Sequence, residues 1–222
     1  MKKRVLVIAP HPDDEVLGAG GVMARFAAEG ADVFVAVVTK GGPPLFTEDF
    51  VEQARREAKE AHQILGVKET RFLDLPAAGL DSIPHRTVNA ALVDVVKEFE
   101  PDLLFIPFNG DIHLDHQLIF LSSLVAVRPG STLRKIGIYA YETLSETNWN
   151  APYITPSFVP NTFFDITEYL DLKMAAMKAF SSQVKPFPNE RSLETLRALA
   201  MLRGSTVGAH AAEAFVLIRA VS

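Results

Sequence analysis

Two short segments of the sequence concentrate the side chains that could do chemistry, residues 9–15 and residues 110–116. They contain three of the chain's six histidines, so the arrangement favours a shared site. Their reactive side chains are His11, Asp13, Asp14, His113, Asp115 and His116. Because the chain has no cysteine, a transition metal bound here must take imidazole and carboxylate ligands.

Three of these residues suit one metal ion. His11 and Asp14 stand three residues apart across a turn, so both can reach the same ion, and His116 can reach it from the second segment. Three protein ligands with one open position describe a catalytic zinc site. The spacing therefore predicts such a site, although either histidine of the second segment taken alone would more often lie on the surface.

The other three residues suit the chemistry beside such an ion. Asp13 has no ligand role and is placed to take a proton from metal-bound water, whose pKa a catalytic zinc lowers to roughly 7. His113 could donate a hydrogen bond to a developing oxyanion, and Asp115 could orient that imidazole. The acidic run 13–15 also has a simpler explanation, because acids are favoured at the start of any helix.

The elements that must position these segments alternate between strand and helix patterns in the first two-thirds of the chain. Strands are predicted at residues 4–9, 32–39, 70–75, 102–107 and 135–141, with the first and fourth of them buried, and helices at residues 16–29, 49–65, 86–99 and 118–127. This alternation predicts a mostly parallel sheet in a three-layer α/β sandwich. Ligands bind such sheets at the carboxyl ends of the strands, so the loops after the first and fourth strands can meet there.

The last third follows a different pattern. Residues 143–164 are too polar and too rich in proline for a regular element. Helices are predicted at 168–181 and 190–203, and a strand at 214–220. We interpret the chain as one domain over residues 1–222 with a C-terminal elaboration from about residue 143.

The glycines at positions 18, 20 and 21 do not indicate a nucleotide site. They lie inside the first predicted helix, after the acidic turn, where a pyrophosphate would meet carboxylates. We expect them to serve close packing of the helix on the sheet.

The composition excludes several classes of protein. Twenty-two basic and 27 acidic residues give a net charge of −5, which disfavours nonspecific binding to nucleic acid or an anionic membrane. The basic start at residues 2–4 precedes an apolar run too short for a signal peptide. No apolar stretch approaches roughly 20 residues, so no membrane insertion is expected and a cytoplasmic location is predicted.

The two reactive segments resemble those of the PIG-L/LmbE family of zinc-dependent N-deacetylases. The similarity includes the residues that follow the first segment and several positions further along: Leu17-Gly18, Gly20-Gly21, Arg55-Arg56-Glu57-Ala58, Leu65-Gly66-Val67, Ser181, Gln183 and Ala212-Glu213-Ala214-Phe215. It covers nearly the whole chain and implies a Rossmann-like sandwich, one Zn²⁺ per chain with other divalent metals such as Fe²⁺ possible, and a homo-oligomer.

The resemblance assigns a role to each matched residue. His11, Asp14 and His116 match the metal ligands, and Asp13 matches the general base. His113 matches the oxyanion stabiliser, and Asp115 matches the carboxylate that supports it. Arg55 matches a substrate-contacting arginine, with Arg56 as an adjacent alternative. Leu114 stands where many members carry proline.

The activity implied is removal of the acetyl group from an N-acetylated amino sugar, such as an N-acetylglucosamine conjugate. Zinc-activated water attacks the amide, and acetate and a free amine are released. Two histidines and a carboxylate also describe non-haem iron oxygenases, but the α/β alternation and Asp13 fit hydrolysis better. A non-catalytic sugar-binding protein would lack Asp13 or a ligand, and none is missing.

The surroundings of the site are less specified. The mouth is expected to be lined by residues 40–46, 76–84 and 143–164. Tyr141, Trp149 and Tyr153 could stack on a sugar ring or pack a subunit contact. Of the remaining histidines, we expect His62 and His85 at the surface, and His210 could reach the site edge.

Overall fold

The fold is built on one sheet with the strand order β3-β2-β1-β4-β5-β7-β6. It is seen in a computed structural model that describes residues 2–130 and 134–221. The strands in this part of the chain are β1 (Arg4–Ala9), β2 (Asp32–Lys40), β3 (Glu69–Pro76), β4 (Leu103–Pro107), β5 (Gly137–Tyr141), β6 (Thr162–Asp165) and β7 (Ala212–Arg219). Strands β1 to β5 pair in parallel, whereas β7 runs antiparallel to both β5 and β6.

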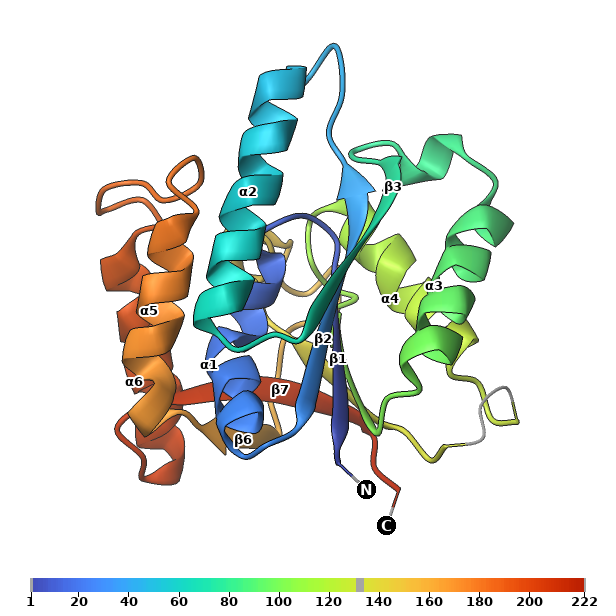
Figure 1. The fold of residues 1–222 in the computed structure, drawn as a ribbon. Helices are drawn as coiled ribbons and strands as arrows, with labels where there is room; N and C mark the ends of the chain where they lie inside the picture. The colour runs from blue at the N-terminus through green and yellow to red at the C-terminus, as the bar shows by residue number, and fades with distance from the viewer. Residues whose placement is uncertain (1, 131–133, 222) are drawn as a thin grey trace.

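Helices cover both faces of this sheet, which gives the three layers predicted from the sequence (Figure 1). One face is covered by α1 (Asp14–Ala28), α2 (Glu48–Ile64), α5 (Leu170–Ala179) and α6 (Leu193–Val207), and the other by α3 (His85–Phe99) and α4 (Leu114–Ala126). The α/β sandwich with a mostly parallel sheet is therefore confirmed.

The sequence of β1 shows why the sheet is buried on both sides. Val5 and Val7 point into the core beneath α1, and Leu6 and Ile8 point into the core beneath α3 and α4. All four are fully buried. Because successive side chains of a strand point to opposite faces, a strand covered on both faces has a continuous run of apolar residues.

The strand order reverses between β1 and β4. From β1 the chain continues through β2 to β3 on one side, and from β4 it continues to β5 on the other. The loops that follow β1 and β4 therefore leave neighbouring strands at the same edge of the sheet. This is the meeting point predicted for the two reactive segments.

The glycines of α1 allow the close packing expected of them. A Cβ atom at Gly18 would collide with the ring of Tyr141, and one at Gly21 would collide with Ile166. Tyr141 is itself fully buried, and its hydroxyl donates to the carbonyl of Ile8 at 2.8 Å. The expectation that Tyr141 stacks on a sugar or packs a subunit contact is therefore wrong.

Helix α1 is held by a buried ion pair where its own hydrogen bonding is interrupted. Ala19 has non-helical angles (φ −140°). Beyond it, the Glu213 carboxylate accepts the N–H groups of Gly21 (2.9 Å) and Val22 (2.7 Å). Lys173 donates to the same carboxylate at 2.5 Å. Glu213 thus satisfies the open amides of a second helix start and fixes the helix that carries Asp14.

Three elements differ from the sequence prediction by more than two residues. The segment 143–164, expected to be irregular, ends in β6, which forms because β7 offers an unpaired edge beyond β5. Helix α4 begins at Leu114, four residues early, because the His113 side chain accepts the N–H of Asp115 and caps it. Helix α6 begins at Leu193 because Ser192 caps it, so residues 190–192 belong to a loop.

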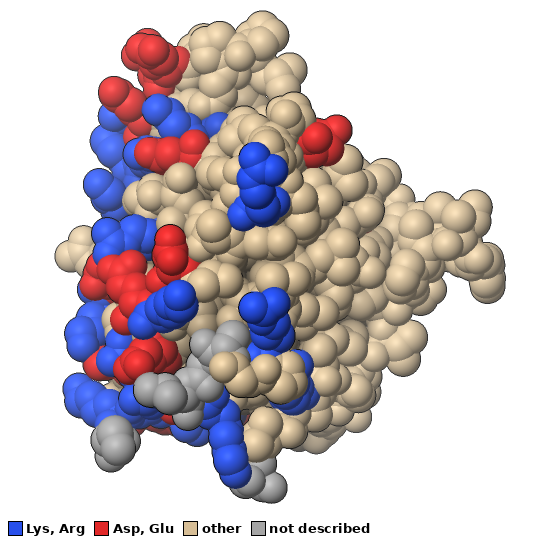
Figure 2. Space-filling model, turned by 90° about the vertical axis from the view of Figure 1, so that its right-hand side faces the viewer, with Lys and Arg blue, Asp and Glu red and all other residues tan. Residues whose placement is uncertain are grey.

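The surface seen from the side of α3 and α4 is unevenly charged (Figure 2). Lysine, arginine and acidic side chains gather along one side of this view, and most of the remaining area is uncharged. Helix α4 exposes Leu114, Leu121 and Val125. No helix of the described residues is long and apolar enough to cross a bilayer.

Candidate active site

The turn between β1 and α1 brings the first reactive segment to the edge of the sheet. Asp13 stands at the helix start with φ +111°, a conformation that side chains rarely adopt and that only a well-supported turn maintains. Asp14 is the first residue of α1, and its carboxylate accepts the backbone N–H of His11 at 2.8 Å. This hydrogen bond closes the turn and places both side chains on the same side.

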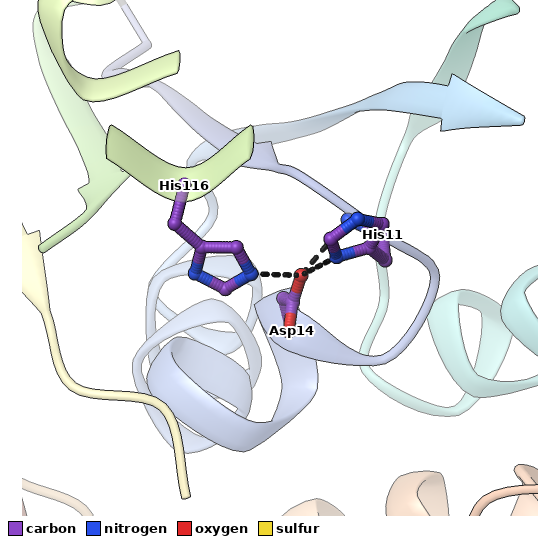
Figure 3. Close-up of side chains that lie close together, drawn as sticks. All are labelled: His11, Asp14 and His116. Atoms are coloured by element: carbon purple, nitrogen blue, oxygen red, sulfur yellow. Dashed lines mark hydrogen bonds and ion pairs between the residues drawn. The ribbon is translucent and has the colours of Figure 1, made fainter. Parts of the chain in front are cut away.

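The three predicted metal ligands come together. In Figure 3 the imidazoles of His11 and His116 point at the carboxylate of Asp14 from opposite sides. Oδ2 of Asp14 lies 3.2 Å from Nδ1 of His11 and 3.2 Å from Nε2 of His116. One ligand atom from each residue lies within 4.8 Å of the other two, so the three can share an ion.

The environment of His116 fits a metal ligand. Its ring is fully buried, and Nε2 makes no hydrogen bond with another described residue. The other ring nitrogen, Nδ1, lies 2.8 Å from Oδ2 of Asp111, whose Oδ1 accepts the hydroxyl of Thr147 at 2.6 Å. A carboxylate on one imidazole nitrogen holds the ring and directs the other nitrogen at a metal.

The ring of His11 has the same arrangement. Nδ1 faces Asp14, and Nε2 lies 3.2 Å from Oδ2 of Asp115. The Asp115 carboxylate is fixed in turn by the backbone N–H groups of Ala78 (2.7 Å) and Leu80 (3.3 Å). Each imidazole of the ligand set therefore has a carboxylate behind it.

These carboxylates make the centre strongly attractive to positive charge. Burial alone would lower the pKa of both imidazoles, but hydrogen bonds that His11 donates to Asp115 and Asp14 raise the pKa of His11 to about 9. Beside Asp14 and Asp111, the pKa of His116 is raised to about 10. A divalent ion would satisfy the same demand and would displace these protons.

His113 stands next to this centre as a neutral imidazole. Its ring centroid lies 4.5 Å from that of His11, and burial together with the charge of His11 lowers the pKa of His113. Nδ1 accepts the backbone N–H of Asp115 at 3.1 Å, so the ring proton is on Nε2. The Asp115 carboxylate lies 4.0 Å from Nδ1, beyond hydrogen-bond distance, so it is the backbone of Asp115 that orients this ring.

Asp13 is buried and is held by an arginine that sequence reasoning missed. Nη1 of Arg191 donates to Oδ2 of Asp13 at 2.8 Å, and Nε of Arg191 donates to Ser145 at 2.9 Å. Burial raises the pKa of Asp13 to about 8, although Arg191 acts in the opposite direction. A carboxylate that titrates near neutral pH can both accept and release a proton.

A cavity of about 220 Å³ opens onto these side chains. His11, Asp13 and His113 lie in its wall, together with residues from all three of the segments expected at the mouth. Those segments contribute Lys40, Gly41, Phe46, Ala77, Ala78 and Glu146. Burial and the charge of Asp14 raise the pKa of Glu146 to about 7.

Comparison with known proteins identifies the family. The model of the PIG-L family, described as GlcNAc-PI de-N-acetylase, matches residues 6–126, more than half of the chain. The chain belongs to the PIG-L family.

Individual members agree over most of the chain. An uncharacterized deacetylase of Escherichia coli (strain K12), YaiS, is 30% identical over 190 residues, or 82% of this chain and 92% of that protein. The diacetylchitobiose deacetylase of Thermococcus kodakarensis is 27% identical over 222 residues, covering 95% and 81% of the two chains. The solved structure of the conserved protein TT1542 from Thermus thermophilus matches with a TM-score of 0.80 and 26% identity, over 99% and 96% of the two chains.

The two candidate arginines of this PIG-L protein are separated by the structure. Arg55 lines the cavity, lies over the ring of Phe72 at 4.8 Å and pairs with Asp74. Arg56 is 70% exposed and pairs with Glu52 at 3.8 Å. Of these two arginines, Arg55 is therefore the one within reach of a ligand in this cavity.

One expected surface histidine supports the site instead. His62 is buried, with Nε2 at 2.9 Å from Glu15 and Nδ1 at 2.7 Å from Thr70. Glu15 also accepts the backbone N–H of Asp13 at 3.2 Å, so this chain of contacts supports the strained turn. The expectation that His62 lies at the surface is therefore wrong. The contact with Glu15 could not be predicted, because the two residues are 47 positions apart in the sequence.

The remaining expectations concern residues outside the cavity. His85 is exposed, as predicted. His210 lies with Arg25 and Glu29 at the far end of α1 from Asp14, so it does not reach the site edge. Trp149 and Tyr153 are exposed and are absent from the cavity wall. Leu114, the departure from the family motif, is exposed at the first position of α4.

Proposed function

We propose that the protein is a metal-dependent hydrolase that removes the acetyl group from an N-acetylated amino sugar. His11, Asp14 and His116 would hold the ion, with zinc as the expected metal. The observation that carries the proposal is the position of Asp13, a buried carboxylate beside this ligand set and in the wall of the same cavity. Named relatives such as the diacetylchitobiose deacetylase support an acetamido sugar as substrate.

The residues divide the reaction between them. A bound divalent metal supplies Lewis acidity, which polarises a carbonyl group and makes water more acidic. Arg191 donates to Oδ2 of Asp13, which leaves Oδ1 free of that contact to take a proton from the attacking water. As the carbonyl oxygen of the substrate becomes negative, Nε2–H of His113 donates a hydrogen bond to it.

The same carboxyl group completes the reaction. Once protonated, Asp13 gives its proton to the nitrogen of the departing amine, so that acetate and a free amino sugar are released. Arg191 holds the carboxylate in one orientation through both transfers, because its guanidinium is itself fixed by Ser145 and Gln183. Deacetylase relatives and a carboxylate beside the ligand set favour hydrolysis over the oxygenase alternative.

The test compares the wild type with Asp13→Asn. Metal content and acetate release are measured on the same samples, with a panel of N-acetylglucosamine derivatives as substrates. We expect about one zinc per chain in both proteins and a loss of at least about 10²-fold in turnover for the variant. Asp171→Asn, on the exposed side of α5, is the matched control and should change neither quantity. If the wild type binds no divalent metal, the ligand assignment is wrong.

A further inference from the structure

The cavity is lined by two groups of residues with different chemistry. The catalytic side presents His11, Asp13, His113, Glu146, Gln183 and Arg191. Seven apolar residues, here called the apolar wall, line the rest of the cavity together with a few polar groups: Phe46, Phe50, Val51, Ala54, Phe72, Ala77 and Ala78. An acetyl group has a single methyl to bury, so a wall of seven apolar residues exceeds what the leaving acetyl group needs.

The apolar wall is held by contacts within the protein. The rings of Phe46 and Phe50 stack with centroids 5.4 Å apart and planes inclined by 17°. Thr47, which lies between them in sequence, caps α2 by accepting the N–H of Phe50. Val51 and Ala54 continue the wall along the same helix and are each 8% exposed. A rigid surface of this kind binds without the cost of ordering loose side chains.

Two of the polar side chains beside the apolar wall, Thr39 and Arg55, already have partners. The hydroxyl of Thr39 donates to the carbonyl of Pro10 at 2.8 Å. The guanidinium of Arg55 is paired with Asp74 and stacked on Phe72. Sugar hydroxyls pressed against this side would lose hydrogen bonds to water and gain few in return, whereas an apolar group would gain from leaving water.

We propose that the substrate carries an apolar group next to the scissile amide, and that this group packs on the apolar wall while the sugar hydroxyls face the catalytic side. This inference rests on the proposed deacetylase function and deepens it. The apolar group has two possible sources, an aglycone such as an aryl or alkyl chain, or an N-acyl group longer than acetyl. Both present the same chemistry to the wall.

The test uses the zinc-loaded protein and four compounds: the methyl, phenyl and octyl glycosides of N-acetylglucosamine, and N-octanoylglucosamine. We expect kcat/KM to rise at least about 10-fold from the methyl glycoside to the preferred apolar compound. A rise among the glycosides assigns the wall to the aglycone, and a rise for N-octanoylglucosamine assigns it to the acyl group. Equal values for all four compounds would overturn the proposal, because the wall would then stack on the sugar ring alone.

Variants link the preference to the wall. Phe50→Ala should reduce the preference to a few-fold, and Phe46→Ser, at a partly exposed ring that tolerates truncation, should reduce it in the same direction. Leu202→Ala, an exposed apolar truncation on α6, should leave the preference unchanged. A preference that survives both phenylalanine variants contradicts the assignment.

A binding measurement separates this inference from the proposed function. Calorimetric titration of zinc-loaded Asp13→Asn with the same compounds reports affinity without turnover. We expect the preferred apolar compound to bind more tightly than the methyl glycoside, and the double variant Phe50→Ala, Asp13→Asn to lose this difference. That result supports binding at the apolar wall even if the wild type hydrolyses none of the compounds. Hydrolysis of all compounds without any preference in affinity leaves the deacetylase standing and refutes the wall.

Discussion

At the scale of single residues, the site is organised by carboxylates behind its imidazoles. Asp111 holds Nδ1 of His116, and Asp115 holds Nε2 of His11. Neither contact was foreseen. The resemblance implies that Asp115 supports His113. Its carboxylate lies 3.2 Å from His11, and its hydrogen bond to His113 comes from the backbone N–H. The orientation of both ligand rings therefore depends on residues outside the ligand set.

Asp111→Asn is expected to weaken metal binding while leaving all three ligands in place. An amide that turns its NH₂ group toward His116 cannot accept the Nδ1 proton, so the ring loses its fixed tautomer and some of its basicity. Changes of this kind typically cost 10–100-fold in metal affinity. Competition with a chromophoric zinc chelator measures the effect.

The control for this prediction is Asp94→Asn, an exposed carboxylate on α3. It should bind zinc as tightly as the wild type. Unchanged affinity in Asp111→Asn would show that the buried Asp111–His116 contact serves packing alone.

At the scale of elements, the loop that carries Arg191 is anchored to α2 through Glu57. The Glu57 carboxylate accepts the hydroxyl of Ser181 at 2.7 Å, the N–H of Ser182 at 3.1 Å and the side chain of Gln53 at 2.9 Å. Burial raises the pKa of Glu57, but these hydrogen bonds and one from the Ser182 hydroxyl outweigh it and lower the pKa below its usual 4.5. The anchor thus depends on an ionised carboxylate.

This dependence predicts how stability changes with pH. A carboxylate whose pKa falls on folding stabilises the folded state fully above its unfolded pKa and loses that contribution as pH falls through the lower, folded value. Glu57→Gln should therefore reduce the free energy of unfolding by about 1 kcal/mol at pH 7, and the difference from the wild type should shrink below pH 4.5.

Urea unfolding measures this difference. It is carried out between about pH 3.5 and about pH 7, which spans the range in which carboxylates titrate. Glu60→Gln is the matched control, because Glu60 is an exposed glutamate on the same helix. A difference that stays constant with pH would mean that the carboxylate charge of Glu57 contributes nothing to the anchor.

The same elements show what the sequence alone can predict. Strands β1 and β4 were predictable because each is an apolar run, and the ligand set was predictable because its members lie in the two short segments that follow these strands. Arg191 was not, because it lies 178 positions from Asp13 in a loop without regular pattern. His62 and β6 were missed for the same reason, since each depends on a partner distant in sequence.

At the scale of the whole molecule, the candidate metal centre joins the two halves of the sheet. His11 and Asp14 follow β1, and His116 follows β4, so an ion bound between them ties together segments on either side of the reversal in strand order. A ligand that binds only the folded state raises its stability in proportion to the logarithm of its concentration. The homo-oligomer implied by the resemblance stays a prediction, and metal binding can be tested without it.

Zinc is therefore expected to stabilise the whole fold. At a free zinc concentration of 100 Kd, the free energy of unfolding should rise by about 2.7 kcal/mol over the chelated protein. For a chain of this size that corresponds to a rise in Tm of roughly 5–10 °C. His116→Ala and His11→Ala should each abolish the rise, whatever their own stability, because each removes one of three ligands. His210→Ala, at the far end of α1, should keep it. If zinc raised the Tm of all four proteins equally, the stabilising ion would bind elsewhere, and the two segments after β1 and β4 would not form its site.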